Sequence, residues 1–179
     1  MSFDSQYAFN HFYEILQAAP VAVLVTVVSA FLGLFGGMLF CVVRLRRIPV
    51  LNTIVGLLVS LIRSTPILVQ LYVVCYGMPR IVAFVHQNPK FVSNVTIYPN
   101  TVAIVTFTLY ASAYFCEIFR SAYFTVGEGQ RESIKSLNLP AVHAVSRIII
   151  PQAAINAVPN ISNSVIDMLK NTSLLYTIS

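Results

Sequence analysis

Charged residues are scarce in this sequence, and their scarcity excludes an ordinary water-soluble domain. Only 9% of the 179 residues are charged, whereas soluble globular domains carry about 25%. Hydrophobic residues make up 57% of the chain, and its mean hydropathy is +0.78. Because a membrane helix needs roughly 20 apolar residues, the chain has room for about four or five spans. The composition therefore predicts a small membrane bundle.

Recognisable enzyme and metal motifs are also missing. The sequence contains no GxSxG, HExxH or CxxC pattern. Each cysteine lies inside an apolar run, where a small core residue is the ordinary role: Cys41, Cys75 and Cys116. There is no GxxxxGK[ST] phosphate loop, so any energy from ATP has to come through a separate chain. We therefore expect no catalytic residue, metal or cofactor.

The start of the chain lacks the positive charge of a cleaved signal peptide. Residues 1–19 contain no Lys or Arg, so the apolar segment that follows is expected to remain in the protein. That segment, Pro20–Val43, is free of charge and is followed by Arg44, Arg46 and Arg47. The positive-inside rule puts this basic cluster in the cytoplasm and the N-terminus outside. Gly33 and Gly37 form a GxxxG pattern, which would allow another helix to pack closely.

The next apolar stretch, residues 51–85, is too long for one simple helix and contains Pro66. Proline disfavours the helical conformation of the preceding residue, so a break is expected at Thr65. Asn52–Ile62 is then predicted as a short segment near the cytoplasmic interface. This placement would keep Arg63 close to the cytoplasmic side.

Further spans complete the predicted bundle. Pro66–Val85 is predicted as the second span, and the polar residues 86–99 as an exterior loop. Asn100–Phe119 is predicted as the third span, and residues 121–147 as a polar cytoplasmic loop. Ile148–Ser179 re-enters the membrane as a fourth, unusually polar segment.

The distribution of basic residues supports this topology. Seven Lys and Arg residues fall on the predicted cytoplasmic side, and only Arg80 and Lys90 fall outside. The net charge of +5 is scattered at the ends of apolar runs, so it indicates topology rather than nucleic-acid binding. Glu117 and Arg120 are expected to form a structural pair at the inner end of the third span. The chain is interpreted as an extracytoplasmic segment, 1–19, followed by one transmembrane domain, 20–179.

The polar loop contains one short segment suited to binding a partner. The run GEGQRESIKSLNL allows a turn at its glycines and about two helical turns over Gln130–Leu137. Ile134 and Leu137 would share a face, and Glu132 could pair with Lys135. Such a helix fits a groove of another protein. A solvated loop helix is the other interpretation that these residues allow.

Polar residues recur at helical spacing in the fourth segment. They follow one another at intervals of 4, 3, 4 and 3 and so share a face: Asn156, Asn160, Asn163, Asp167 and Lys170. Because Asp or Lys at mid-helix costs roughly 2.5 to 3.5 kcal/mol in a membrane, this face should meet protein or water. It either lines a translocation path for a zwitterionic substrate, with Gln70 as a further candidate, or only packs on neighbouring helices.

Three segments resemble, in order, the permease subunits of bacterial ABC importers. Residues 117–153 resemble the cytoplasmic EAA loop of that family. RSTPILVQLY (Arg63–Tyr72) is similar to the RGTPLLVQ segment of its polar amino-acid subfamily, and LKNTSLL (Leu169–Leu175) to the KDTSL segment. Together the matches cover the chain from about Leu51 to Ser179.

The resemblance implies an all-α transmembrane bundle of the importer-permease type, a transporter subunit rather than an enzyme. It implies import of polar or charged amino acids, with cystine among the candidates, across a bacterial inner membrane. The implied partners are cytoplasmic ABC ATPase subunits, an extracytoplasmic solute-binding protein and a second permease chain, identical or different. The implied ATPase-coupling residues are Gly129, Gln130, Arg131, Glu132, Ser133, Ile134, Leu137 and Asn138.

The chain departs from the family pattern at several points. Ser133 and Ile134 stand where the name motif has two alanines, and Asn138 stands where a glycine usually turns the chain. Asn tolerates left-handed geometry, so the turn is still expected. The family usually has one more span after the KDTSL segment, so a chain of about four spans, truncated at Ser179, is expected. A non-transporting membrane scaffold that recruits a partner through the same loop is the alternative function.

Overall fold

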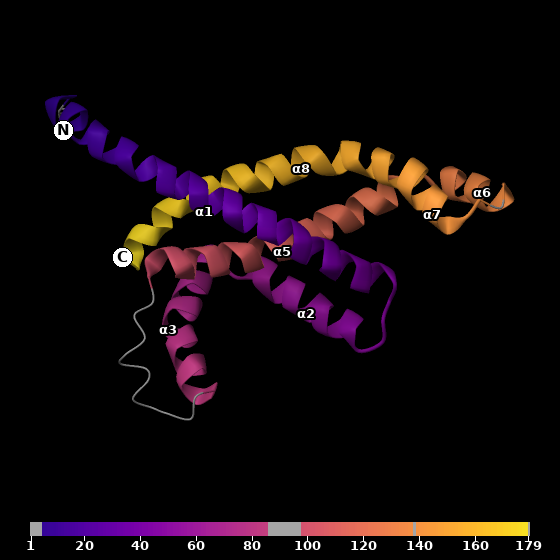
Figure 1. Ribbon diagram of the computed structural model, residues 1–179, viewed down its shortest axis with the longest axis horizontal. Helices are drawn as coiled ribbons and strands as arrows, with labels where there is room; N and C mark the ends of the chain where they lie inside the picture. Colours follow the sequence, from indigo (N-terminus) through magenta and orange to yellow (C-terminus); the bar gives the residue numbers. More distant parts are fainter. Residues whose placement is uncertain (1–4, 86–97, 138, 179) are drawn as a thin grey trace.

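The computed structural model describes residues 5–85, 98–137 and 139–178. Within those ranges the chain is helical and contains no strand, which confirms the all-α prediction (Figure 1). The elements are α1 (Ser5–Leu45), α2 (Leu51–Ser64), α3 (Ile67–Val85), α5 (Pro99–Thr125), α6 (Glu128–Ser136), α7 (Ala141–Ala144), the π-helix η1 (Val145–Ile149), α8 (Ile150–Asn171) and the 3-10 helix η2 (Thr172–Thr177).

Among the described residues, three helices are long and apolar enough to cross a membrane: Leu16–Leu45 within α1, α3 and α5. They correspond to the first three predicted spans. Helix α1 begins well before the predicted start of its span and continues through Pro20, which membrane helices tolerate. The fourth predicted segment, α8, has 22 residues. At 1.5 Å per residue, α8 is about 33 Å long, enough for a hydrocarbon core of about 30 Å despite its polar face.

Helix α5 forms the centre of the bundle. Half of its most apolar window is buried, against 11% for α3, because α1, α2 and α8 all pack against it (Figure 1). One buried cluster joins α1, α5 and α8 through Val25, Ala30, Ala103, Phe107, Ala111, Phe115 and Met168. A second joins α1, α2 and α5 through Cys41, Val55, Val59, Ile62, Ala113 and Cys116.

The GxxxG pattern of α1 packs directly against α5, as its spacing predicted. A Cβ atom added to Gly33 would overlap the Cβ of Ala111, and one added to Gly37 would lie 2.7 Å from the Cβ of Phe115. Real Cβ atoms do not approach so closely, so the absence of side chains is what lets the two backbones meet.

The predicted break between α2 and α3 is present, and Thr65 is extended with φ −101° and ψ 134°. A break leaves backbone carbonyls unpaired in a medium that offers no water. The hydroxyls of Ser64 and Thr65 both donate to the carbonyl of Leu61. The amide of Gln70 donates to the carbonyls of Ile62, at 2.7 Å, and Thr65, at 2.9 Å. Side chains thus stabilise the broken end of α2.

The position of α2 differs from the prediction of a short interfacial segment. Its apolar face, Val55, Val59 and Ile62, is buried lengthwise against α1 and α5. Helix α2 therefore runs back along the bundle from its basic end (Figure 1). As a result Arg63 lies beside Tyr114, partway along α5, and not next to the basic cluster at Arg44. The hydrophobic face of α2 is responsible, because it needs helices to cover it.

Candidate coupling loop and translocation face

The predicted partner-binding segment is a helix that lies beyond the basic end of the bundle. Helix α6 starts two residues before the predicted Gln130, and the amide of Leu137 still donates to the carbonyl of Ser133 at 3.0 Å. Figure 1 shows α6 and α7 projecting together past the ends of α1 and α2. The segment is too short and too polar to span lipid, so it is free to contact another protein.

The outer side of α6 is exposed and hollowed. An open hollow is lined by Gly129, Glu132, Ser133, Ser136 and Leu137. Leu137 is 70% exposed and contributes apolar surface to this hollow. The hydroxyls of Ser133 and Ser136 are occupied by carbonyls one turn earlier, at 2.8 and 3.0 Å. The hollow thus offers apolar surface and the carboxylate of Glu132.

Several predicted coupling residues are placed only in part. Gln130 is exposed and Ile134 is half-buried. The side chains of Arg131 and of its neighbour on α6, the predicted partner Lys135, lie outside the described part of the structure, as does the whole of Asn138. The Glu132–Lys135 pair and the turn at Asn138 therefore stay predictions.

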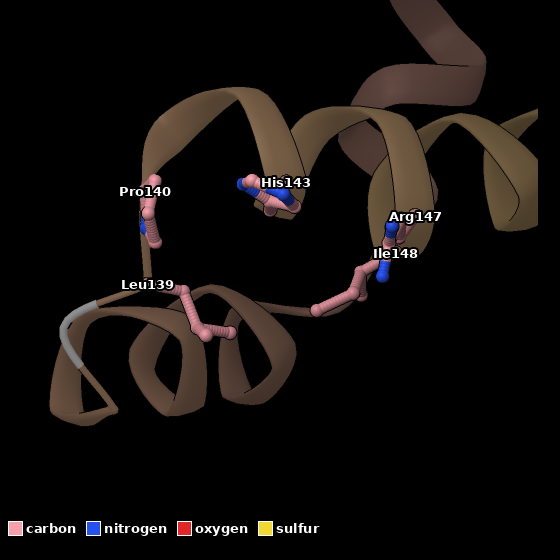
Figure 2. A pocket seen from close by; sticks show the side chains of 5 residues that line it. All are labelled: Leu139, Pro140, His143, Arg147 and Ile148. Carbon is pink, nitrogen blue, oxygen red and sulfur yellow. The ribbon is translucent and has the colours of Figure 1, made fainter.

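A second open hollow follows the coupling helix. Figure 2 shows its lining side chains between α6 and the segment that runs from α7 into η1: Leu139, Pro140, His143, Arg147 and Ile148. His143 and Arg147 are both exposed. Sequence reasoning did not single out this basic pair, although its i, i+4 spacing was a visible signal.

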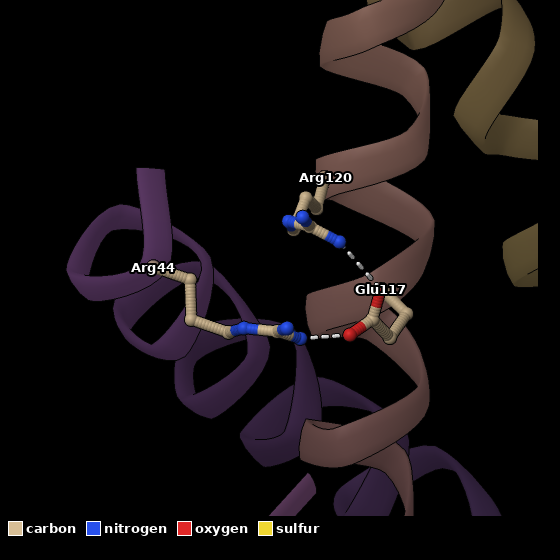
Figure 3. A network of polar contacts seen from close by, with 3 residues as sticks. All are labelled: Arg44, Glu117 and Arg120. Atoms are coloured by element: carbon tan, nitrogen blue, oxygen red, sulfur yellow. Dashed lines mark hydrogen bonds and ion pairs between the residues drawn. The ribbon is translucent and has the colours of Figure 1, made fainter. Parts of the chain in front are cut away.

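An ionic cluster ties α1 to α5 near the basic end. Glu117 pairs with Arg120 through one carboxylate oxygen at 3.4 Å, as predicted, and with Arg44 through the other (Figure 3). The side chains of Arg44 and Glu117 are only 18% and 22% exposed. Sequence reasoning missed Arg44, although both residues close parallel apolar runs at the same predicted side. This ionic cluster fixes how far α1 and α5 are shifted along each other, close to the point where α5 leads into α6.

The polar stripe of α8 occupies one exposed face. Asn160, Asn163, Asp167 and Lys170 are all exposed, while Ala157 and Met168 are buried on the other side. Asp167 and Lys170 form the predicted pair at 3.6 Å, with side chains 58% and 71% exposed. Apolar residues of α8 such as Ile155 and Ile166 are exposed as well, so the role of the stripe stays a prediction.

Two residues of the polar stripe, Asn156 and Asn160, already donate hydrogen bonds within the chain. The amide of Asn156 donates to the hydroxyl of Thr125 at 3.1 Å, which ties the start of α8 to the end of α5. The amide of Asn160 donates to the carbonyl of Asn156 at 3.0 Å. Gln70 lies elsewhere, at the α2–α3 break, where its amide nitrogen is already engaged. The outward-facing set is thus Asn163, Asp167 and Lys170.

These features define a class of protein: a polytopic helical membrane subunit with a short exposed helix beyond one end of the bundle and a polar face along one helix, as in a transporter permease. The family comparison agrees, since residues 29–179 match the model of the binding-protein-dependent transport system inner membrane component. The chain belongs to that family, and it is a multi-pass inner-membrane protein.

Relatives of the chain carry amino-acid permease names. It is 33% identical over 175 residues to the probable amino-acid permease protein YxeN of Bacillus subtilis, covering 98% of this chain and 74% of that one. It is also 33% identical to the L-cystine transport system permease protein TcyL of Bacillus subtilis, with coverage of 89% and 64%. Identity is again 33% to the probable amino-acid ABC transporter permease protein PatM of Vibrio harveyi, with coverage of 99% and 76%.

Two solved structures share the fold. An amino-acid ABC transporter crystallised with histidines superposes with a TM-score of 0.85 at 24% identity, covering 99% of this chain and 78% of that one. The MetNI methionine ABC transporter in an inward-facing conformation gives a TM-score of 0.69 at 18% identity, with coverage of 95% and 76%. At these identities the likeness establishes the fold.

Proposed function

We propose that this chain is the permease subunit of an ATP-driven, binding-protein-dependent importer of amino acids. Polar or charged amino acids, cystine among them, are the substrate class. The observation that carries the proposal is the family match over residues 29–179 together with relatives named for amino-acid and L-cystine transport. The exposed polar face of α8 supports a path, whereas a scaffold that only recruits a partner has no need of it.

The basic end of the bundle faces the cytoplasm in this proposal, and the N-terminus lies outside. Arg44, Arg46 and Arg47 close the first span, and Arg120 lies at the same end through its contact with Glu117. The positive-inside rule favours the cytoplasm for such a cluster. Helix α6 projects from that end and would therefore meet soluble cytoplasmic partners.

Coupling to ATP hydrolysis is assigned to α6. A separate ATPase would receive the exposed side of this helix, with Leu137 in an apolar groove and Glu132 at its polar rim. Closure of the ATPases on ATP would move α6, and α5 would transmit the motion because only a short connection separates Thr125 from Glu128. This is rigid-body coupling, in which packed helices move as units.

The translocation path is assigned to the outward-facing residues of α8. Asn163, Asp167 and Lys170 would face water between this chain and a second permease chain, identical or different. Both charges and the amide suit a zwitterionic solute. A polar face left toward lipid would be costly, which is the physical reason for a second chain to enclose it.

The coupling assignment is tested by charge reversal at Glu132. We expect Glu132→Arg to lower the ATPase activity that loaded binding protein stimulates in membrane vesicles by about tenfold, as lost docking contacts of about 1.4 kcal/mol would do. Ser146→Arg, which introduces the same residue at an exposed site outside both hollows, should leave stimulation intact. If Glu132→Arg stimulates like the unaltered protein, α6 does not couple through this face.

The path assignment is tested by the double variant Asn163→Ala, Asp167→Ala. Uptake should fall strongly at unchanged membrane abundance, because the substrate loses its polar contacts. The matched control is Ser162→Ala, Ile166→Ala, which repeats the same spacing one residue earlier on α8 and should transport normally. Unaltered uptake in the first variant refutes the path role and leaves packing as the function of the stripe.

A further inference from the structure

The second hollow, between α6 and α7, combines an apolar lining with two basic side chains. Leu139, Pro140 and Ile148 supply the apolar part, and His143 and Arg147 supply N–H donors (Figure 2). Its volume of about 460 Å³ falls within the range of about 300–1,000 Å³ that is typical of ligand pockets. The two basic side chains point into the same space, because they lie four residues apart on consecutive helical turns. The hollow therefore suits a partner that presents both a carboxylate and an apolar surface.

Backbone hydrogen bonds hold the walls of this hollow in place. The amide of Leu139 donates to the carbonyl of Ile134 at 3.3 Å, and the amide of Ala144 donates to the carbonyl of Pro140 at 3.0 Å. The side chain of Arg147 is exposed, and none of the ion pairs among the described residues includes it. The hollow is therefore formed before a partner arrives, and the planar fork of Arg147 can bind a carboxylate through two donors.

The distance of Arg147 from the membrane boundary selects between lipid and protein as the occupant. Asn156 of α8 is bonded to Thr125, the last residue of α5, and Arg147 precedes Asn156 by nine residues (156 − 147). Arg120, at the inner end of the span, precedes Thr125 by five residues (125 − 120). At about 1.5 Å per residue these separations are about 13 and 7 Å. The polar layer on each side of a bilayer is only about 5–8 Å thick, so Arg147, in the segment that projects past the bundle, lies beyond the headgroups (Figure 1).

The two hollows beside α6 differ in charge. The hollow on the outer side of α6 presents Glu132, whereas the second presents Arg147, and the two share no lining residue. We propose that Arg147, with His143 beside it, binds an aspartate or glutamate side chain of the cytoplasmic ATPase, while Leu139 and Ile148 receive an apolar residue next to it. Opposite charges in the two hollows let the ATPase bind the α6–α7 segment in one orientation only. This inference rests on the proposed function and adds a second, separate contact to the one at Glu132.

The test measures the affinity of the ATPase for the full permease, with its second chain, in nanodiscs of neutral lipid. Arg147→Gln should raise the dissociation constant by about tenfold, the effect of losing a hydrogen bond between charged groups. It should also flatten the dependence of this affinity on salt concentration, because one charge pair is removed. Arg147→Lys keeps the charge without the fork and should fall between. Arg46→Gln is the matched control, since it removes an exposed charge at the same end of the bundle and should bind normally.

A double variant tests whether the two hollows act separately. Glu132→Gln combined with Arg147→Gln should weaken binding by the product of the two single effects, because the changed groups contact different parts of the ATPase. Unchanged affinity and unchanged salt dependence in Arg147→Gln would overturn the inference. So would a loss of affinity that appears only in parallel nanodiscs containing anionic lipid, because the hollow would then bind headgroups. If the unaltered permease binds no ATPase at all, the proposed function fails instead.

Discussion

Single residues decide how α1 meets α5. Gly33 and Gly37 allow backbone contact, and the Glu117 carboxylate then joins Arg44 to Arg120 at the end of the same interface. The sequence predicted the glycine contact from its spacing, and it predicted the Glu117–Arg120 pair one helical turn apart. The pairing of Arg44 with Glu117 was not predicted, because residues 73 positions apart are brought together only by the register of two parallel helices.

Enlarging the helix contact should destabilise the bundle. In Gly37→Leu the new side chain meets Phe115 and the backbone nitrogen of Cys116, at 2.7 and 3.0 Å from its Cβ. We expect a loss of about 1–3 kcal/mol in unfolding free energy, measured as a lower melting temperature in detergent. Gly56→Leu is the control, because nothing lies within 4 Å of that position. Because leucine favours the helix over glycine at both positions, an equal loss in both variants would show that the close contact with α5 is not responsible.

Removing the shared carboxylate should also be costly. Glu117→Gln leaves Arg44 and Arg120 without their counterion in a largely buried place. The expected loss is about 1–3 kcal/mol. The double variant Arg44→Gln, Glu117→Gln should lose less than the sum of the two single changes, since both remove the same interaction. Strict additivity in thermal unfolding would contradict a direct pair.

At the scale of elements, the sequence predicted which helices form better than it predicted where they lie in the bundle. The break at Thr65 followed from Pro66, and the helix after Gly127 followed from its turn residues and spacing. The position of α2 within the bundle could not be predicted from the sequence, because the same amphipathic pattern suits a helix on the membrane surface and a helix packed in a bundle. Only the packing of Val59 against α1 and α5 distinguishes them. That packing places Arg63 beside Tyr114, partway along α5.

The hydrogen bonds of Gln70 at the break between α2 and α3 can be tested by substitution. Gln70→Met keeps the length of the side chain but removes both donors, which leaves the carbonyls of Ile62 and Thr65 unpaired. Each orphaned group costs about 1–3 kcal/mol, so the melting temperature should fall clearly. Gln152→Met on α8 makes the same exchange and should change stability by less than about 0.5 kcal/mol. If Gln70→Met melts like the unaltered protein, the break is stabilised by other groups.

At the scale of the whole molecule, one chain leaves two kinds of surface uncovered. The outer side of α1 exposes large apolar side chains such as Phe31, Phe35 and Leu39, which suit lipid. The polar face of α8 is exposed as well, and lipid does not suit it. The resemblance of three segments to the permease family implied partner chains, whereas composition predicted only a membrane bundle. In the proposed function, a second chain covers the polar face of α8 and an ATPase binds α6.

Uptake by the reconstituted transporter shows whether this chain carries amino acids across the membrane. The permease, its partner ATPase and its solute-binding protein would be placed in proteoliposomes that contain ATP, and a panel of radiolabelled polar and charged amino acids, cystine included, would be added outside. The account predicts accumulation of at least one of them with ATP and none with a non-hydrolysable analogue. Equal levels with ATP and with the analogue, for every amino acid tested, would contradict it.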